Sequence, residues 1–337
     1  MAATSPSQSG PPQKRTWVTL LTRTSYLPGA ILLAYSLHSL KSEYPLLILI
    51  TPSFPSYLIP TLTSETTLTN SSLLLIEPLS PPPHNAPASL ITSRFEDTWT
   101  KLRVFELHKH GFEKLVFLDA DMLVLRNMDE LFDFHLPGED WIAANHACVC
   151  NLDSDSWAPE NWTKDNCAYK DLKPKSPPTP VPPIGHENGK DAWSEPHRRL
   201  NSGMFLFMPY QLQWEKMLGF LNTDESVKQF LFPDQDFLAA YFSDKWKSIG
   251  WQYNALKTMR YWHQHMWVDN DIKNLHYIVD KPWSKRIGPD GVAGYLERDG
   301  ITHSWWWEHY RNWEVERESL GASEILEMMR MEIAQPL

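Results

Sequence analysis

The stretch "KLVFLDADMLVL" (residues 114–125) places two aspartates, Asp119 and Asp121, between two apolar runs. Side chains two residues apart on an extended backbone point to the same side, so the two carboxylates converge. Ionised carboxylates this close repel each other unless a cation lies between them, and Mg²⁺ and Mn²⁺ prefer oxygen ligands. The stretch therefore predicts a buried strand that ends at a divalent-metal site.

Strands and helices alternate on both sides of this stretch. Apolar runs bounded by turn-forming residues predict strands, most of them parallel and buried, at 16–22, 46–51, 73–77, 114–119, 141–145, 203–208 and 274–279. Apolar residues at helical spacing predict helices at 28–44, 93–111, 210–222, 236–242 and in the last stretch of the chain. This alternation is typical of an α/β fold with a mostly parallel sheet flanked by helices. Ligands bind at the carboxyl ends of the strands in such sheets, where the aspartate pair lies.

The domain organisation is predicted from composition and periodicity. Residues 1–15 are polar and contain Pro and Gly, so we expect a disordered tail. Residues 16–320 form a single domain, interrupted at about 147–200 by an insertion with the Pro-rich tract "KPKSPPTPVPPIGHENG" (173–189). We expect residues 321–337 to form a C-terminal helix or tail.

Charge and composition exclude several functions. The net charge of the 337 residues is −10, which argues against a nucleic-acid groove or an anionic membrane patch. The first apolar stretch is interrupted by Arg23, Ser25 and Pro28, so we expect no membrane span. The N-terminus lacks the order of a signal peptide, and three cysteines are too few for a disulfide framework. We therefore expect a cytoplasmic protein, whose oligomeric state the sequence does not reveal.

The Asp-x-Asp pattern alone is weakly specific. The chain contains four such triplets, at 119–121, 153–155, 234–236 and 269–271, and only the first directly ends a strongly apolar strand. An apolar run before Asp-x-Asp also opens the haloacid-dehalogenase-like phosphatases. Their motif lies near the chain start and usually has Thr or Val four residues after the first Asp, where this chain has Leu123. A phosphatase is therefore a minor alternative.

Several further segments accompany the motif in a characteristic order. They are "TKLRVFELHKHGFEKLVFLDADMLVLRNMDELFD" (100–133), "LNSGMFLFMP" (200–209), "DQDFLAAYF" (234–242) and "HYIVDKPW" (276–283). In these segments the chain resembles the family 8 glycosyltransferases, among them the glycogenins and, more closely, the plant galactinol synthases. "KLRVFEL" (101–107) and "YNALKTMRYWH" (253–263) are similar to the galactinol synthase subgroup.

The resemblance implies a GT-A fold and a retaining transfer of a hexose from a UDP-sugar, with Mn²⁺ or Mg²⁺ as cofactor. It also implies that Asp119, Asp121 and His276 bind the metal and that Lys281 contacts the diphosphate. His303 is the competing third ligand. This chain differs from the family pattern by a shorter spacing between His276 and Lys281 and by having no glycine in "YIVD" (277–280).

The resemblance assigns further residues to the donor. The donor-binding set is Leu21, Thr22, Tyr26, Lys101, Asp119, Ala120, Asp121, Asn201, Ser202, Gly203 and Lys281. Asp234 and Gln235 match the pair beside the anomeric carbon, and we predict them as the catalytic residues.

The acceptor is predicted only by class: myo-inositol, another polyol or sugar, or a glycan. A glycogenin-like enzyme acting on protein or glycan and a degenerate sugar-nucleotide binder are alternatives. Tyr261 has the spacing of the tyrosine that glycogenins glucosylate on themselves, but its surroundings resemble galactinol synthases, so we expect no glycosylation there. The cysteines Cys148, Cys150 and Cys167 predict structural or incidental thiols, or alternatively a zinc site completed by a residue such as His146.

Overall fold

The computed structural model describes residues 14–88, 93–184 and 192–335. The predicted disordered tail lies outside these residues except for Lys14 and Arg15, and Arg15 begins the first strand. Among the described residues, no helix has the length and apolar character needed to cross a bilayer.

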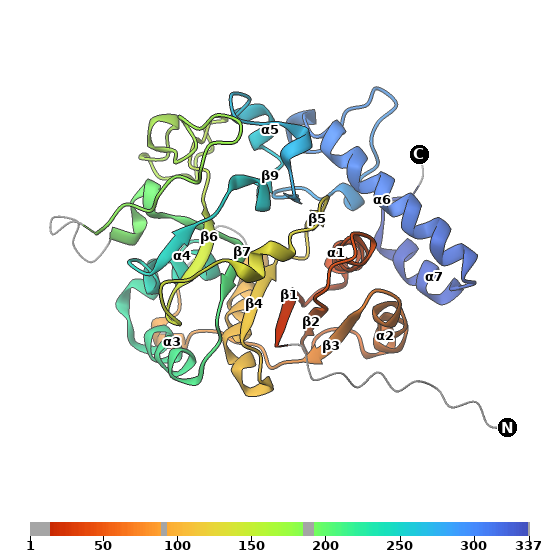
Figure 1. Cartoon of the computed structure of the whole chain (residues 1–337), viewed down its shortest axis with the longest axis horizontal. Helices are drawn as coiled ribbons and strands as arrows, with labels where there is room; N and C mark the ends of the chain where they lie inside the picture. The colour runs from red at the N-terminus through yellow and green to blue at the C-terminus, as the bar shows by residue number, and fades with distance from the viewer. Residues whose placement is uncertain (1–13, 89–92, 185–191, 336–337) are drawn as a thin grey trace.

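One mixed, mostly parallel sheet forms the centre of the molecule (Figure 1). Its order is β3-β2-β1-β4-β7-β6-β8, and only β7 runs antiparallel to its two neighbours. The strands are β1 (Arg15–Leu21), β2 (Leu46–Ile50), β3 (Ser71–Leu75), β4 (Lys114–Leu118), β6 (Ile142–His146), β7 (Leu200–Phe207) and β8 (Trp246–Ser248). The continuous apolar runs of β2 and β4 are buried because both faces of the sheet are covered.

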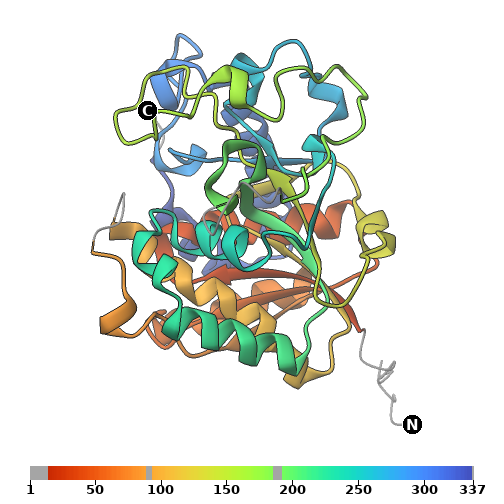
Figure 2. The same ribbon diagram turned by 90° about the vertical axis from the view of Figure 1, so that its left-hand side faces the viewer.

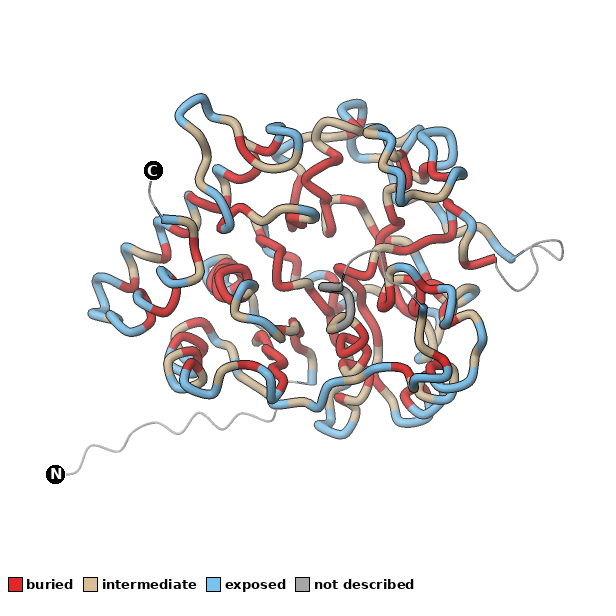
Figure 3. Tube along the Cα trace, turned by 180° about the vertical axis from the view of Figure 1, so that it is seen from behind, coloured by how far each residue is buried: buried red, intermediate tan, exposed pale blue. Residues whose placement is uncertain are grey.

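Two groups of helices cover the two faces of the sheet. Alternate residues of β1 face opposite sides, so Trp17 and Val18 belong to two separate hydrophobic clusters. The cluster of Trp17 includes residues of α1 (Leu27–Ser39), α2 (Ile59–Leu68), α6 (Gly300–Ser319) and α7 (Ser323–Glu332). The cluster of Val18 includes residues of the 3-10 helix η4 (Ser93–His110), α3 (Gln211–Thr223) and α4 (Pro233–Tyr241). The sheet therefore lies between two helical layers, and Figure 3 shows the buried residues concentrated along it.

A second, small sheet brings a distant part of the chain to the aspartate motif. It consists of β5 (Met122–Val124), β10 (Asn274–His276) and β9 (Ala255–Leu256), in the order β5-β10-β9. In the antiparallel pairing of β10 with β5, His276 lies opposite Met122. Because Met122 directly follows Asp121, this register places His276 beside the second aspartate.

The predicted insertion is part of the folded molecule wherever it is described. Short 3-10 turns and loops make up residues 147–184 and 192–199, and no regular helix of two turns is found in them. Figure 2 shows this segment beside the chain that contains the short helix α5 (Met259–Trp262), at the end of the molecule away from the N-terminus. Contacts between Cys148 and His263 confirm that the two segments touch.

Several observed elements differ from the prediction. The predicted helix at 93–111 is present as a 3-10 helix, and α2 was not predicted because Pro60 and four threonines hide its weak apolar spacing. The predicted strand at 274–279 is shorter in the structure, because β10 ends at His276 and the backbone turns left-handed at Val279 (φ 66°) before the predicted end.

Candidate active site

A cavity of about 510 Å³ opens where β4 ends and β7 begins, beside the small sheet. It is lined by the predicted site residues Thr22, Tyr26, Lys101, Asp119, Ala120, Asp121, Asn201, Ser202, Gly203, Asp234, Gln235, His276 and Lys281. Leu21 is not among the lining residues. Its side chain is fully buried in the core, and its neighbours Leu20 and Thr22 line the cavity instead.

The turn that holds the two aspartates is fixed by close backbone packing. The amide of Asp119 donates a hydrogen bond to the carbonyl of Gly203 (2.8 Å), and the carbonyl of Asp121 accepts one from the amide of Tyr277 (2.9 Å). A Cβ atom at Gly29, in the first turn of α1, would lie 2.1 Å from the carbonyl oxygen of Ala120. Helix α1 therefore packs against the motif at a distance that only glycine allows.

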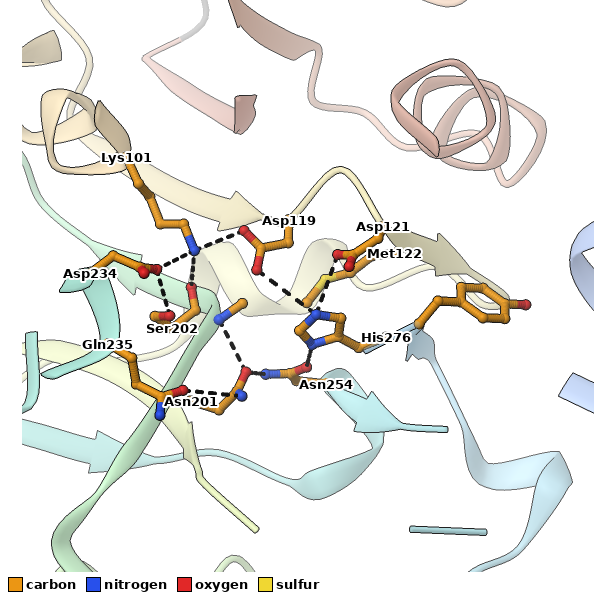
Figure 4. Close-up of polar contacts among 12 residues, drawn as sticks. Lys101, Asp119, Asp121, Met122, Asn201, Ser202, Asp234, Gln235, Asn254 and His276 are labelled. Atoms are coloured by element: carbon orange, nitrogen blue, oxygen red, sulfur yellow. Dashed lines mark hydrogen bonds and ion pairs between the residues drawn. The ribbon is translucent and has the colours of Figure 1, made fainter. Parts of the chain in front are cut away.

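One ring nitrogen of His276 faces the two carboxylates, and the other faces the side-chain amide of Asn254 (Figure 4). Its Nε2 lies 3.3 Å from Asp121 Oδ1 and 3.8 Å from Asp119 Oδ2. Its Nδ1 lies 2.9 Å from Asn254 Oδ1. Because the amide oxygen only accepts, Nδ1 carries a hydrogen in this arrangement, and Nε2 is the nitrogen that faces the aspartates.

A chain of amides determines which way Asn254 points. The Nδ2 of Asn254 donates to Asn201 Oδ1 (2.8 Å), which leaves the oxygen of Asn254 for the histidine. Asn201 in turn donates from its Nδ2 to Gln235 Oε1 (3.4 Å). Three predicted site residues, Asn201, Gln235 and His276, are thus connected through a residue that was not predicted to act in the site.

Gly203 provides the space that this histidine occupies. A Cβ atom at position 203 would lie 2.3 Å from Cε1 of His276 and 2.8 Å from its Nδ1. Any other residue at this position would therefore displace the imidazole.

Lys101 joins the first aspartate to the predicted catalytic pair. Its ammonium group lies 2.8 Å from Asp119 Oδ1 and 2.5 Å from Asp234 Oδ2, and the lysine is 5% exposed. Burial opposes its charge, but the two carboxylates outweigh burial and raise the pKa of Lys101 above its usual value. Ser202 also donates from Oγ to Asp234 (2.7 Å), and the pKa of Asp234 is lowered despite burial, chiefly by Lys101.

Lys281 occupies the other side of the aspartate pair. Its ammonium group contacts Asp121 Oδ2, donates to the carbonyl of Tyr277 (2.7 Å) and lies 5.6 Å from the ring centre of Tyr26. Burial would raise the pKa of Asp121, but Lys281 and His276 hold it well below its usual range. The pKa of Asp119 is raised, mainly by burial and further by the Asp121 carboxylate.

The donor atoms fit a divalent cation. Around an octahedral ion with bonds of 2.0–2.1 Å, adjacent ligands are separated by about 3 Å. The separations of 3.3 and 3.8 Å between His276 Nε2 and the two carboxylates are close to this value. Three carboxylates, of Asp119, Asp121 and Asp234, face two ammonium groups, so a bound cation would also balance the excess negative charge.

His303, the competing ligand, belongs to a different cluster. Its nearest carboxylate is Asp299 (3.9 Å), and Lys257 contacts Asp299 and lies 3.5 Å from Asp280. Lys257 therefore neutralises this acidic cluster. Burial, with the nearby lysines, lowers the pKa of His303 to about 3. Among the two candidate histidines, only His276 faces the aspartate motif.

Two other side chains lie apart from the cavity. The hydroxyl of Tyr261 is buried without a hydrogen-bond partner, and Tyr261 does not line the cavity. His146 was the suggested fourth partner of the cysteines, and this suggestion was wrong. The Nε2 of His146 contacts the carbonyl of Thr179 (2.9 Å), whereas His263 is the histidine that faces the three sulfurs.

Sequence reasoning missed one wall of the cavity. It is lined by Trp157 and Trp162 of the insertion and Trp262 of α5, together with Phe232 and Tyr295. Trp162 stacks on Phe232 (centroid distance 6.1 Å), and Trp157, which is 45% exposed, meets both rings edge-on. The aperiodic insertion contained no signal for this wall, and Asn254 belongs to the 253–263 segment that resembles the galactinol synthases but was assigned no role.

Comparisons with known proteins identify the family of this chain. The family model described as "Glycosyl transferase family 8" matches residues 17–286. Galactinol synthase 6 of Arabidopsis thaliana is 28% identical over 317 residues, which cover 92% of this chain and 85% of that protein. Galactinol synthase 1 of Solanum lycopersicum is 28% identical over 302 residues, which cover 88% of this chain and 82% of that protein.

Solved structures match the fold over most of the chain. The galactosyltransferase LgtC in complex with donor and acceptor sugar analogs matches with a TM-score of 0.54 and 15% identity, over 86% of this chain and 94% of that one. The glycosyltransferase GlyE of Streptococcus pneumoniae matches with a TM-score of 0.53 and 18% identity over 90% of this chain. This chain spans 64% of the length of GlyE. These matches confirm the predicted GT-A fold.

Proposed function

This chain belongs to glycosyltransferase family 8, a family of retaining transferases that use UDP-hexoses, and we propose that it makes a galactinol-like product. In this proposal, galactose or glucose moves from its UDP-sugar to a hydroxyl of myo-inositol or of another small polyol or sugar. One observation carries the proposal: Asp119, Asp121, His276 and Lys281 converge in one cavity from separate parts of the chain. This convergence favours an active transferase over a degenerate sugar-nucleotide binder, which would not need all four side chains.

The metal is the first part of the proposal. We assign Asp119, Asp121 and His276 as its ligands and Mn²⁺ as the ion, with Mg²⁺ as the substitute, because all three present O or N donors at suitable separations. A bound divalent cation would neutralise charge that develops on the UDP diphosphate as the sugar leaves. Lys281 supplies a second positive charge on the same side of the cavity.

The UDP-sugar donor is proposed to bind along the cavity, with its uridine, hexose and anomeric carbon each next to different lining residues. Tyr26 and Thr22 lie at the end of β1, where a ring and a hydroxyl suit the uridine. Asn201, Ser202 and Gly203 suit the hydroxyls of the hexose. Asp234 and Gln235 are assigned beside the anomeric carbon, and Lys101 holds Asp234 ionised there through a contact of 2.5 Å.

The acceptor is proposed to bind against the aromatic wall. Trp157 lines the cavity and is 45% exposed, and carbohydrate and cyclitol rings pack their C–H groups on the faces of aromatic rings. Tyr261 is proposed not to be an acceptor, because its hydroxyl is buried and lies outside the cavity lining. We further propose a cytoplasmic location, where a reducing environment would preserve the three free cysteines.

The test is UDP release from UDP-galactose and from UDP-glucose with Mn²⁺, with and without myo-inositol. We expect release from one of the donors to rise at least about tenfold when myo-inositol is added, a barrier difference of about 1.4 kcal/mol. Slow UDP release that does not change when myo-inositol is added would support the donor site and indicate that the acceptor is a glycan or a protein. No release from either donor would instead support the degenerate sugar-nucleotide binder, and hexose on the intact protein would support a glycogenin-like reaction.

A further inference from the structure

All three cysteines of the chain meet one histidine in the wall beside the cavity. Cys148 and Cys150 directly follow β6, Cys167 lies 17 positions further along the insertion, and His263 follows α5. The Nε2 of His263 lies 3.2 Å from the sulfur of Cys148, 3.4 Å from that of Cys150 and 3.8 Å from that of Cys167. The four ligand atoms all lie within 4.8 Å of one another.

Hydrogen bonding does not explain this arrangement. One imidazole nitrogen makes one hydrogen bond, yet three sulfurs surround this one. Disulfide bonding does not explain it either, because the three cysteines are free. Cys150, Cys167 and His263 are at most 2% exposed, so water is not a ready partner for the group.

The separations match those of a tetrahedral zinc centre. With Zn–S bonds near 2.3 Å and a Zn–N bond of 2.0–2.1 Å, tetrahedral geometry places sulfur and nitrogen about 3.6 Å apart. The three observed separations, 3.2 to 3.8 Å, bracket this value. Thiolate ligands select zinc over the manganese and magnesium that oxygen ligands prefer, so this centre would not compete for the ion of the aspartate motif.

We propose that Cys148, Cys150, Cys167 and His263 bind one structural zinc ion. Three cysteines and one histidine complete a tetrahedron and leave no position for a substrate, as in structural zinc sites. The ion would close the loop between Cys150 and Cys167 and attach it to the segment that follows α5. Zinc binding in such a site contributes directly to folding, which suits a segment with little regular secondary structure.

The site also has a consequence for the cavity, and this consequence rests on the proposed function. Cys148 lines the cavity itself, Trp157 and Trp162 belong to the loop that the ion would close, and Trp262 immediately precedes His263. Loss of zinc would therefore weaken acceptor binding more than donor binding. The zinc content itself does not depend on which acceptor is used.

The test measures zinc per chain in the full-length protein after dialysis against a mild chelator, which removes ions held by oxygen ligands. We expect one zinc ion per chain, with an X-ray absorption spectrum of three sulfurs at about 2.3 Å and one nitrogen at about 2.0 Å. A mercurial reagent should release the ion as it titrates the cysteines, and no other cysteine in the chain obscures this titration.

Variants separate this site from its neighbours. Cys150→Ser and His263→Gln should bind zinc at least about tenfold more weakly. His265→Gln, which removes a nearby ring whose Nε2 contacts the carbonyl of Tyr169 (3.0 Å), should retain the ion, as should Asp121→Asn in the aspartate motif. A zinc-free wild-type protein with three freely reactive thiols would overturn the proposal, as would full zinc content in both ligand variants. If the ligand variants fail to fold, the X-ray absorption spectrum and the mercurial release of zinc from the wild-type protein still test the proposal.

Discussion

The orientation of a single amide decides how His276 meets the metal ligands. Asn254 accepts the Nδ1 hydrogen of the imidazole because its own Nδ2 is committed to Asn201. Partners of this kind hold the tautomer and the ring orientation of a metal-binding histidine. Without Asn254, the imidazole could present either nitrogen and rotate in the space that Gly203 leaves.

Replacing Asn254 with alanine should therefore weaken metal binding without removing a metal ligand. We expect Asn254→Ala to lower the apparent affinity for Mn²⁺ by about 10–100-fold, measured as the Mn²⁺ dependence of UDP release. Asn222→Ala, at an exposed position of α3, is the matched control and should leave this dependence unchanged. An unchanged Mn²⁺ dependence in Asn254→Ala would show that the amide does not orient the ligand.

At this scale the sequence predicted the residues of linear motifs and missed residues that act through contacts between distant segments. Asp119 and Asp121 were recognisable because they end an apolar strand, and Lys281 because it belongs to "KPW". His263 was not recognisable as a partner of the cysteines. It lies 96 positions after Cys167, far outside the short spacings by which zinc ligands are usually recognised.

The connection from β10 to Lys281 differs from the family pattern that the sequence resembles, by its shorter spacing and its lack of glycine. Val279 takes φ 66° in the "YIVD" segment, in the region that β-branched residues avoid. β10 ends at His276, three residues before this left-handed residue, and Lys281, two residues after it, contacts Asp121. The sequence revealed the missing glycine, but the strand prediction ran too far because alternation continues through Val279.

Glycine at this position should relieve the strain. A non-glycine residue in such a conformation costs about 1–3 kcal/mol of stability, which glycine would recover. Glycine also loses more backbone entropy on folding, which reduces the recovered stability by about 0.5–1 kcal/mol. We expect Val279→Gly to raise the free energy of unfolding in urea by about 1 kcal/mol. Val315→Gly, at an exposed position of α6 with ordinary helical geometry, should lower it. Destabilisation of similar size in both variants would contradict the assignment of strain.

At the scale of the whole molecule, a buried ion pair joins the C-terminal helix α6 to the N-terminal half. Arg317 of α6 donates from Nε and Nη2 to the two carboxylate oxygens of Glu65 in α2 (2.7 and 2.9 Å). Trp313 donates from Nε1 to the same carboxylate (2.9 Å). Arg317 is fully buried and Glu65 is 1% exposed, so each group depends on the other for charge compensation.

Removing one charge of this pair should destabilise the molecule strongly. We expect Glu65→Gln to lower the free energy of unfolding by about 3 kcal/mol, because the buried guanidinium then keeps a single carboxylate partner, Glu316, among the described residues. The matched control is Glu225→Gln, which removes an exposed pair with Lys228 and should change stability by about 0.5 kcal/mol or less. Equal effects in chemical denaturation would show that α6 does not depend on this contact.

The overall architecture could be predicted because it depends on local patterns. Alternating strands and helices indicate a parallel sheet, and the motif order resembled that of the family that the comparisons then showed. The insertion could not be predicted in this way, because its structure depends on contacts with α5 and the cysteine cluster rather than on its own periodicity.

Metal-dependent UDP binding by the aspartate motif is the central claim, and titration calorimetry of UDP tests it most directly. We expect wild-type protein to bind UDP at least about tenfold more tightly with Mn²⁺ than without it, a difference of about 1.4 kcal/mol. Asp121→Asn should lose this dependence and all turnover while leaving the fold intact, as followed by circular dichroism. Retention of the full Mn²⁺ effect and of turnover in Asp121→Asn would contradict the account.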